Sequence, residues 1–570
     1  MLTVTPLKRR FLPQDFTLTT WEALEPYTKE LENRSLDTLE DYQRFLDDSD
    51  ELSRVMGENS AWRYIRMTCN TADKEIEQAY HYLIEHIMPK AAEFGNVINN
   101  KMAQSPFSKE VNDTGFALMM RKIQSEIEIF RDENIPLSSE ADQVSAEFVK
   151  LNGAMKVTLD GEEMPLQKAA DRLFWTDRAK REEAWTAIGA RRYEDREKLD
   201  DIYDRLVGLR HKIALNAGFE NYRDYAFKAK KRFDYGPKEC YDFHEAIEQA
   251  VTPLVREINV TQAKELGLEK LRPWDGAVDP KGRPPLKAFE SAEDLIEKSL
   301  VMYKDLDPLF HDTVQMMKDQ NKLDLASRLN KAPGGYMYPL GESKVPFIFA
   351  NATQKVDDLV TYVHEVGHAV HEIAKRDLRL EEYGNYPSEV AELASMSMEL
   401  LTMDQWNLFF PKEDDLVRAK YDHLERTISL LPWIAQVDAF QHEIYLKPEL
   451  SPQERHALWS SIQQRYNTNT VDWTGFEHLQ KTMWHKQGHI FDVPFYYIEY
   501  GIAQLGALQV WRNYKQDKKQ ALEQYKNALA LGYTKSIPEI YETAGIKFDF
   551  SAKMLKELMS FVQKEMAALS

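Results

Sequence analysis

The stretch QKVDDLVTYVHEVGHAVHEIAK, residues 354–375, is a helix-forming sequence that directly follows a short β-prone segment. That segment, Lys344–Ala350, is rich in β-branched and aromatic residues, which favours a strand. Pro346 has no N–H group to donate, so we expect the strand at the edge of a sheet. Asn351 or Thr353 can cap the helix, because a short polar side chain accepts hydrogen bonds from its first free N–H groups. The order turn, edge strand, helix predicts a small β-sheet next to this helix.

Most of the remaining chain has the composition and periodicity of helices. Glu, Lys, Leu and Ala are plentiful, whereas the 570 residues include only 23 Gly and 24 Pro. Within residues 141–151, the apolar Val144, Phe148 and Leu151 recur at three- and four-residue intervals, which is typical of an amphipathic helix. The sequence therefore predicts a mainly α protein.

Two further segments interrupt the helical pattern. In Val157–Leu166, the pair Asp160-Gly161 follows a β-prone run and predicts a tight hairpin turn, since both turn positions favour positive φ. Gly267–Pro285 is dense in Pro and Gly and predicts a long loop.

The composition narrows the class of protein. The formal net charge of −20 argues against nucleic acid, whose phosphates attract Lys and Arg. Cys69 and Cys240 are too few for a disulfide framework, which fits a reducing compartment. The start of the sequence has no apolar segment of a signal peptide, and no run of about 18 apolar residues occurs. We expect a soluble cytoplasmic protein without nucleic-acid or membrane partners.

The motif His364-Glu365-Val366-Gly367-His368 carries the chemistry of the helix at residues 354–375. Residues at i and i+4 lie on one helical face, so both imidazoles can bind one Zn²⁺ at about 2.0–2.1 Å. Glu365 then lies beside the metal, where it can accept a proton from a water molecule. Gly367 inside a helix costs about 1 kcal/mol relative to Ala, which indicates a close approach of another segment.

A catalytic zinc ion needs a third protein ligand. The long metzincin motif is absent, since His371 and Ala374 stand where its Gly and third His would be. A glutamate from a second helix is the other option, and Pro387-Ser388 marks the start of such a helix. Spacing alone does not choose between Glu389 and Glu392, and either can instead lie on a solvated helix face.

These residues resemble the thimet oligopeptidase / oligoendopeptidase F family of zinc peptidases. Family members have a His-Glu-x-Gly-His helix and a glutamate about 24–25 positions beyond the second His, followed by a Ser and another Glu. Glu392, Ser395 and Glu399 match that pattern. The resemblance assigns the third zinc ligand to Glu392 and makes Glu399 a partner that orients a ligand histidine. Glu389 remains the alternative.

A second group of polar and aromatic residues occurs at 488–500, GHIFDVPFYYIEY. Such a cluster can be ordinary core, but His N–H and Tyr O–H groups also suit stabilisation of an oxyanion. Tyr497 and Tyr500 would share one helical face. The family has a similar stretch, and the resemblance assigns transition-state stabilisation and substrate binding to His489, Tyr497 and Tyr500. Tyr496 remains an alternative to Tyr497. The sequence Pro-Phe-Tyr-Tyr at residues 494–497 resembles the oligoendopeptidase F branch of the family.

The resemblance also implies a fold and an activity. It predicts a two-lobed helical shell around a deep central channel, with residues 1–190 contributing to the lid and residues 191–570 forming the catalytic region. The implied activity is zinc-dependent cleavage of internal bonds in short, unstructured oligopeptides, with one zinc ion per chain and Glu365 as general base. The alternatives are a helical metallocarboxypeptidase and a non-catalytic peptide-binding scaffold. Oligomeric state and side-chain preference are not encoded in these motifs.

Overall fold

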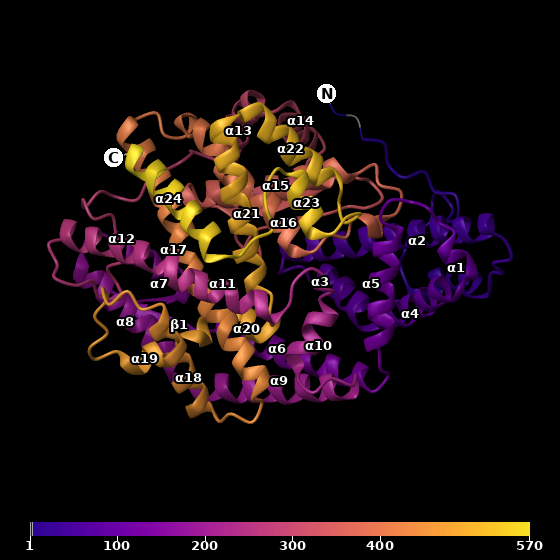
Figure 1. Ribbon diagram of the computed structural model, residues 1–570, viewed down its shortest axis with the longest axis horizontal. Coiled ribbons are helices and arrows are strands. Elements are labelled where there is room, and N and C mark those ends of the chain that lie inside the picture. Colours follow the sequence, from indigo (N-terminus) through magenta and orange to yellow (C-terminus); the bar gives the residue numbers. More distant parts are fainter. Residues whose placement is uncertain (1, 3, 570) are drawn as a thin grey trace. The chain divides into compact units, whose positions relative to one another are not determined.

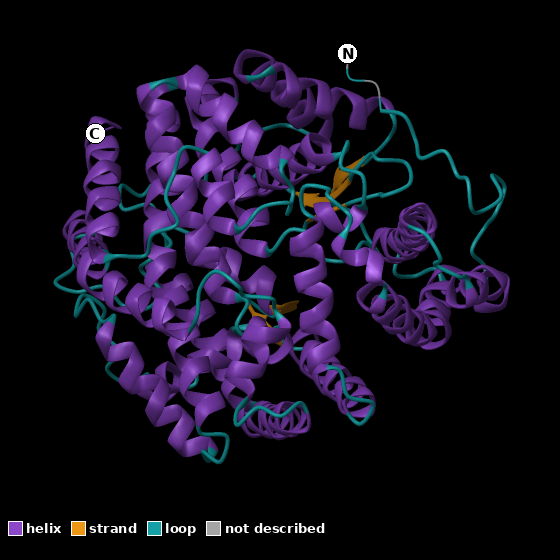
Figure 2. Cartoon of the chain, turned by 45° about the vertical axis from the view of Figure 1, so that its right-hand side comes forward, coloured by secondary structure: helices purple, strands orange, loops and turns teal. Residues whose placement is uncertain are grey.

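The protein is described by a computed structural model that covers residue 2 and residues 4–569. Helices make up most of the described chain, and the strands form two small sheets (Figure 2). The prediction of a mainly α protein is therefore confirmed. None of the described helices combines the length and the apolar character that a bilayer crossing requires.

The chain divides into two compact units, each built from separate segments of the sequence. The first unit comprises residues 1–127, 287–419 and 506–548, and the second comprises residues 128–286, 420–505 and 549–570. The divisions at 419/420 and 505/506 fall inside α17 (Glu413–Leu446) and α21 (Tyr497–Gln516). The predicted division assigned residues 1–190 to the lid and residues 191–570 to the catalytic region. It concerns the functions of these regions and stays a prediction.

The first unit contains the predicted motif helix and its small sheet (Figure 1). Its elements are α1 (Trp21–Asn33), α2 (Leu39–Cys69), α3 (Lys74–Tyr82), α4 (Met88–Gln104), most of α5 (Phe116–Ile129), α13 (Ala292–Leu306), α14 (Pro308–Asp319), β3 (Leu323–Ala326), β4 (Tyr336–Tyr338), β5 (Phe347–Ala352), α15 (Val356–Lys375), α16 (Ser388–Thr402), α22 (Lys518–Ala530) and α23 (Ile537–Thr543).

The second unit is helical apart from one hairpin. Its elements are α6 (Asn134–Gly153), β1 (Lys156–Leu159), β2 (Glu162–Pro165), α7 (Leu166–Ala170), α8 (Arg178–Glu194), α9 (Arg196–Asn216), α10 (Tyr222–Ala229), α11 (Pro237–Ala250), α12 (Thr252–Glu265), α18 (Pro452–Arg465), α19 (Glu477–Lys481), α20 (Gly488–Asp492) and α24 (Ala552–Leu569).

The hairpin follows the sequence prediction. β1 and β2 pair antiparallel, with Leu159 opposite Glu162. Asp160 and Gly161 both have positive φ, 54° and 80°, as the turn requires. The predicted loop at Gly267–Pro285 also lies between two helices, α12 and α13.

The sheet beside α15 corrects one prediction. Its strand order is β3-β5-β4, so β5 is the central strand and not an edge. Pro346 lies immediately before β5, where its missing N–H costs the ladder no hydrogen bond. β4 is an edge strand instead, and it pairs antiparallel with β5 through Met337 opposite Ile348.

The start of α15 also differs from the prediction. Lys355 is the N-cap residue, and neither Asn351 nor Thr353 occupies that position. The Asp358 carboxylate accepts hydrogen bonds from the Lys355 N–H at 3.0 Å and from the Thr353 hydroxyl at 3.0 Å. The acidic side chain at the third helical position therefore satisfies the N–H group of the N-cap residue, as in one half of a capping box. Similarly, Ser388 is the first residue of α16 and Pro387 is its N-cap.

The helix α15 packs closely against α16 at Gly367. A Cβ atom placed on Gly367 would lie 2.6 Å from the Ser395 Cα, 2.9 Å from the Ala394 carbonyl oxygen and 3.0 Å from the Met398 Cβ. Two of these atoms belong to the backbone of α16, so they cannot move aside without shifting that helix. Gly367 is therefore required by the distance between the two helices, as its place in the motif suggested.

We predict that Gly367→Ala lowers the free energy of unfolding by about 1–3 kcal/mol, because the added methyl group overpacks the α15–α16 contact. The matched control is Gly57→Ala in α2, where a Cβ would meet no atom within 4 Å. The control is expected to be neutral or to stabilise by up to about 1 kcal/mol, through helix propensity. Thermal and denaturant unfolding of both variants test this, and equal stability of the two would contradict the contact.

Candidate metal centre and associated polar groups

The imidazoles of His364 and His368 lie on one face of α15. Their ring centroids are 4.9 Å apart and their planes are nearly perpendicular, at 86°. Both side chains are partly exposed, at 21% and 14%. The i, i+4 spacing thus places two metal-binding nitrogens next to each other.

Glu392 of α16 joins these two histidines. Its Oε2 lies 3.3 Å from the His364 Nε2 and 3.8 Å from the His368 Nε2. The ligand atoms of the three residues all lie within 4.8 Å of one another. The Ser395 hydroxyl donates to the same Oε2 at 3.0 Å. Two neutral imidazoles and one carboxylate form the donor set of many catalytic zinc sites, so the residues present fit this ion.

Glu399 lies two helical turns after Glu392 on α16 and contacts the other ring nitrogen of His364. Its Oε1 lies 2.7 Å from the His364 Nδ1. The Nδ1–H group donates to this carboxylate, which leaves the Nε2 lone pair directed toward Glu392. A histidine that binds a metal through Nε2 commonly has such a partner, because the bond holds the ring in one orientation.

The alternative ligand, Glu389, is placed differently. It is buried at the start of α16, and its backbone carbonyl accepts a hydrogen bond from the Tyr541 hydroxyl. Among the described residues, the group that gathers around the two imidazoles contains Glu392. The α-helical rotation of 100° per residue separates the two glutamates, which sequence spacing left equivalent.

Glu365 is buried between α15 and the sheet, with 7% of its surface exposed. Burial raises the pKa of its carboxyl group to about 7, while the charge of the adjacent His364 and a hydrogen bond with the Met337 backbone act to lower it. Met337 belongs to the edge strand β4. The carboxylate therefore lies beside both the candidate ligands and a strand edge.

His371, the third histidine of α15, takes no part in this group. Its ring stacks on Tyr386 at a centroid distance of 3.7 Å and an angle of 7°. The Tyr386 hydroxyl donates to Glu372 at 2.6 Å. Both ring nitrogens of His371 are buried, and burial lowers its pKa well below the ordinary value. His371 packs α15 against Tyr386 and is not a candidate metal ligand.

The polar and aromatic residues 488–500 form a cluster within the second unit. His489 lies against Tyr497 and Tyr500, with ring centroids 5.1 Å and 5.9 Å away, and against Tyr496 at 5.8 Å. Tyr497 and Tyr500 occupy the first turn of α21, and their rings are 5.6 Å apart. Tyr497 is buried, whereas Tyr496 and Tyr500 are partly exposed. Exposure therefore leaves Tyr496 as a serious alternative to Tyr497.

The tautomer of His489 follows from a chain of hydrogen bonds that the sequence did not reveal. The Trp433 indole N–H donates to the Gln487 Oε1 at 2.9 Å. The amide nitrogen of Gln487 then donates to the His489 Nδ1 at 2.7 Å, so the ring carries its proton on Nε2. Gln487 stands only two positions before His489, but nothing in that spacing distinguished it from other glutamines.

The backbone between His489 and Tyr497 is held in an uncommon conformation. Phe495 has a φ of 63°, in the left-handed region that non-glycine residues rarely adopt. Its N–H donates to the Gln441 Oε1 at 3.2 Å, and its carbonyl accepts a hydrogen bond from Arg232. These two contacts hold the backbone immediately before Tyr496 and Tyr497 in place.

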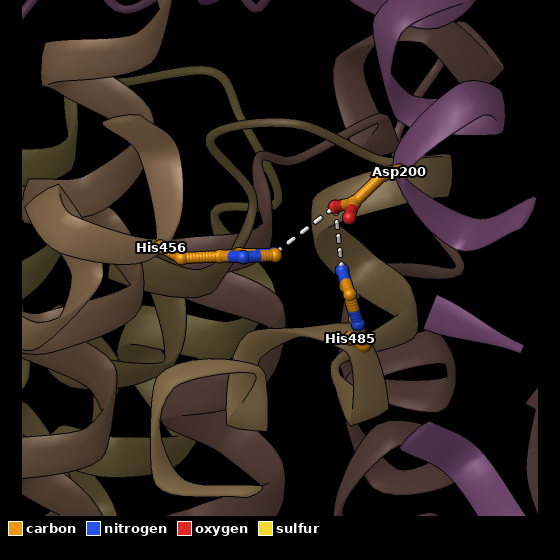
Figure 3. Close-up of side chains that lie close together, drawn as sticks. All are labelled: Asp200, His456 and His485. Atoms are coloured by element: carbon orange, nitrogen blue, oxygen red, sulfur yellow. Dashed lines mark hydrogen bonds and ion pairs between the residues drawn. The ribbon is translucent and has the colours of Figure 1, made fainter. Parts of the chain in front are cut away.

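Two other groups of potential metal ligands lie in the second unit. One contains Cys240, Asp438 and His442. The other contains Asp200, His456 and His485, in which the Asp200 Oδ1 accepts from both imidazoles at 3.2 Å and 3.0 Å (Figure 3). Figure 3 shows both rings directed at that one oxygen atom. Hydrogen bonding accounts for this second arrangement without a metal ion.

We predict that Glu392→Ala abolishes zinc binding at the His364–His368 pair, because only two nitrogen ligands remain. Glu389→Ala is the matched variant on the same helix and is expected to keep the ion. Titration of the metal-free protein with zinc against a chromophoric chelator measures both affinities. Loss of the ion from the Glu389 variant alone would reverse the assignment.

Sequence comparison relates both parts of the chain to one family. Residues 175–560 match the profile described as "Peptidase family M3", and residues 11–130 match "Peptidase M3 N-terminal domain". Among curated proteins, "Oligoendopeptidase F, plasmid" of Lactococcus lactis subsp. cremoris is 24% identical over 406 residues, which cover 68% of this chain and 65% of that protein. An "Oligoendopeptidase F homolog" of Lactococcus lactis subsp. lactis is 26% identical over 285 residues, covering 49% and 43%. The matched part is thus less than two thirds of either relative.

Comparison of folds extends the similarity to nearly the whole chain. The solved structure of "PZ peptidase A with inhibitor 2" superimposes with a TM-score of 0.90 at 26% sequence identity, covering 98% of this chain and 99% of that one. Its helical architecture agrees with the fold described above.

Proposed function

This chain belongs to peptidase family M3, and on that premise we propose that it is a zinc-dependent endopeptidase that hydrolyses internal bonds of short, unstructured oligopeptides. The observation that carries the proposal is the convergence of His364, His368 and Glu392 within 4.8 Å, with Glu365 on the same helix as the two histidines. The names of the relatives, oligoendopeptidase F and its homolog, support the size class of the substrate.

His364, His368 and Glu392 would hold the zinc ion. When bound there, zinc supplies a Lewis acid that lowers the pKa of a water molecule toward about 7. Glu399 keeps the His364 ring in place through the 2.7 Å contact with Nδ1. Ser395 holds the ligand oxygen of Glu392 through its hydroxyl group. Glu399 and Ser395 thus restrict the motion of the metal ligands before the substrate binds.

Glu365 is the group that we assign to proton transfer. Its carboxylate accepts the proton of the attacking water and then passes it to the nitrogen of the leaving amine. No covalent bond between enzyme and peptide is required, since water is the nucleophile. The low exposure of Glu365 supports this role, because a buried carboxylate is shielded from competition with bulk water.

We assign the binding of the substrate carbonyl group to His489, Tyr497 and Tyr500. His489 accepts a hydrogen bond from Gln487 on its Nδ1, so we assign its Nε2–H group as the ring donor to a developing oxyanion. The Tyr500 hydroxyl, on a partly exposed side chain, is the second donor. Tyr497, or the more exposed Tyr496, completes the contact with substrate.

The edge strand β4 is the candidate site for the peptide backbone. An edge strand has N–H and C=O groups that can pair with an extended chain. Met337 of β4 also hydrogen-bonds Glu365, so a peptide along this edge lies near the assigned base. Recognition through the backbone is compatible with many side chains, as an oligopeptidase requires.

We predict that Glu365→Gln reduces kcat by at least about 10²-fold, because the amide cannot accept the proton of water. Zinc content should stay at the wild-type value, since Glu365 is not a ligand in this assignment. Stopped assays with a quenched fluorescent peptide, together with metal analysis of the same sample, measure both quantities. Full turnover in the variant would remove Glu365 from the mechanism.

The reaction class is tested by mass spectrometry of the products from a mixed peptide pool, with and without a chelator. We expect internal cuts in short peptides, no cleavage of folded proteins, and loss of all cuts when the metal is removed. Activity should return when zinc is added back. Removal of single C-terminal residues would indicate a carboxypeptidase, and unchanged peptides under all conditions would indicate a binding scaffold.

A further inference from the structure

Two helices of the second unit bring together four side chains of metal-ligand type. Cys240 and His244 are four residues apart on α11, and Asp438 and His442 are four residues apart on α17. Each pair lies on one helical face. All four residues are at most 1% exposed, so the cluster lies fully inside the unit.

The distances within the cluster suit coordination. The Cys240 sulfur, a carboxylate oxygen of Asp438 and a ring nitrogen of His442 all lie within 4.8 Å of one another. The His442 Nε2 is 3.3 Å from the Asp438 Oδ2. The His244 Nε2 donates to the same Oδ2 at 2.8 Å. The Oδ2 atom of Asp438 therefore has a hydrogen-bond donor, and its Oδ1 atom has none among the described residues.

Several ligand atoms here have unused lone pairs. Within the described part of the chain, the Asp438 Oδ1 and both nitrogens of His442 are buried and have no hydrogen-bond partner. A buried polar atom without a partner costs about 1–3 kcal/mol. The Asp200 cluster also places one carboxylate oxygen beside two imidazoles, but both of those contacts are hydrogen bonds and the cluster contains no sulfur (Figure 3).

The surroundings make an isolated charge unfavourable. The rings of Phe227, Tyr241 and Phe495 contact the His442 imidazole at centroid distances of 5.8, 5.0 and 5.3 Å. The Asp438 carboxylate lies within 2.8 Å and 3.3 Å of the two imidazoles, and no lysine or arginine of the described residues forms an ion pair with it.

A divalent cation resolves both features. With one carboxylate, one thiolate and neutral imidazoles, the charge of the ion is cancelled within the cluster. The cation would also take the lone pairs of the Asp438 Oδ1 and of one His442 nitrogen. Thiolate and imidazole ligands favour Zn²⁺ over Mg²⁺ or Ca²⁺, which prefer oxygen. Binding releases the Cys240 thiol proton to solvent, and no redox change is involved.

We propose that Cys240, Asp438 and His442 form a second, structural zinc site, in which His244 positions the carboxylate of Asp438. This site does not depend on the proposed peptidase activity, and its ligands include a sulfur atom that the His364–His368–Glu392 group lacks. Its role is to hold α11 against α17.

Cobalt substitution separates the two sites in the intact protein. The metal-free chain should bind about two Co²⁺ ions, and one of them should give the near-ultraviolet charge-transfer band of a cobalt–thiolate bond. The double variant His364→Ala/His368→Ala should bind about one ion and keep that band. A wild-type chain that binds about one ion and shows no thiolate band would overturn the proposal.

Cysteine variants identify the sulfur ligand. Cys240→Ala should lose the band and one ion, whereas the control Cys69→Ala should keep both, because Cys69 lies in the first unit and bonds Asp324. A band that survives Cys240→Ala would also refute the site. If Cys240→Ala does not fold, Asp438→Asn provides the second variant, and the wild-type stoichiometry and spectrum decide the question without either.

A stability measurement shows whether the ion is structural. In the His364→Ala/His368→Ala background, saturating zinc should raise the melting temperature, because only the second site remains to bind it. Adding Cys240→Ala to that background should abolish the zinc-dependent rise. Equal rises in the two proteins would contradict a structural site at Cys240.

Discussion

The close approach of α15 to α16 at Gly367 is the contact on which the candidate metal centre depends. The absence of a side chain there lets the Ser395 Cα and the Ala394 carbonyl lie against α15. As a result, α16 is near enough for Glu392 to reach the imidazoles of His364 and His368, and for Glu399 to reach the His364 Nδ1. Four polar side chains of the candidate metal centre are thus positioned by one missing methyl group.

Buried carboxylates paired with histidines recur in this protein, and their surroundings distinguish them. Glu392 lies beside two partly exposed imidazoles, an arrangement that suits an ion with an open coordination position. One oxygen of Asp200 accepts hydrogen bonds from two imidazole rings, and these bonds explain the arrangement without a metal ion. Asp438 is fully enclosed, has an unpaired oxygen, and lies beside a thiol. Burial, hydrogen bonding and the presence of sulfur therefore distinguish three surroundings of one pairing of residue types.

The differences between expectation and structure have specific physical causes. Pro346 was expected to confine its strand to an edge, but it lies just before β5 and leaves the central ladder intact. The helix α15 begins after Lys355, whose N–H group donates to the carboxylate of Asp358 in the first turn, and no short polar side chain caps it. The sequence does not predict the role of Gln487, because its effect on the His489 tautomer requires the Trp433 indole, 54 residues away in the chain.

The sequence by itself determined the helical class, the hairpin at Asp160-Gly161 and the two histidines of the motif, because these depend on local periodicity and on residues a few positions apart. Only the tertiary structure decided between Glu389 and Glu392 as the carboxylate beside them, placed β4 at the sheet edge, and brought Cys240 to Asp438. Each of these depends on how separate helices and strands pack. Side chains far apart in sequence meet only when the buried surfaces between them are complementary, and spacing along a single chain does not specify that fit.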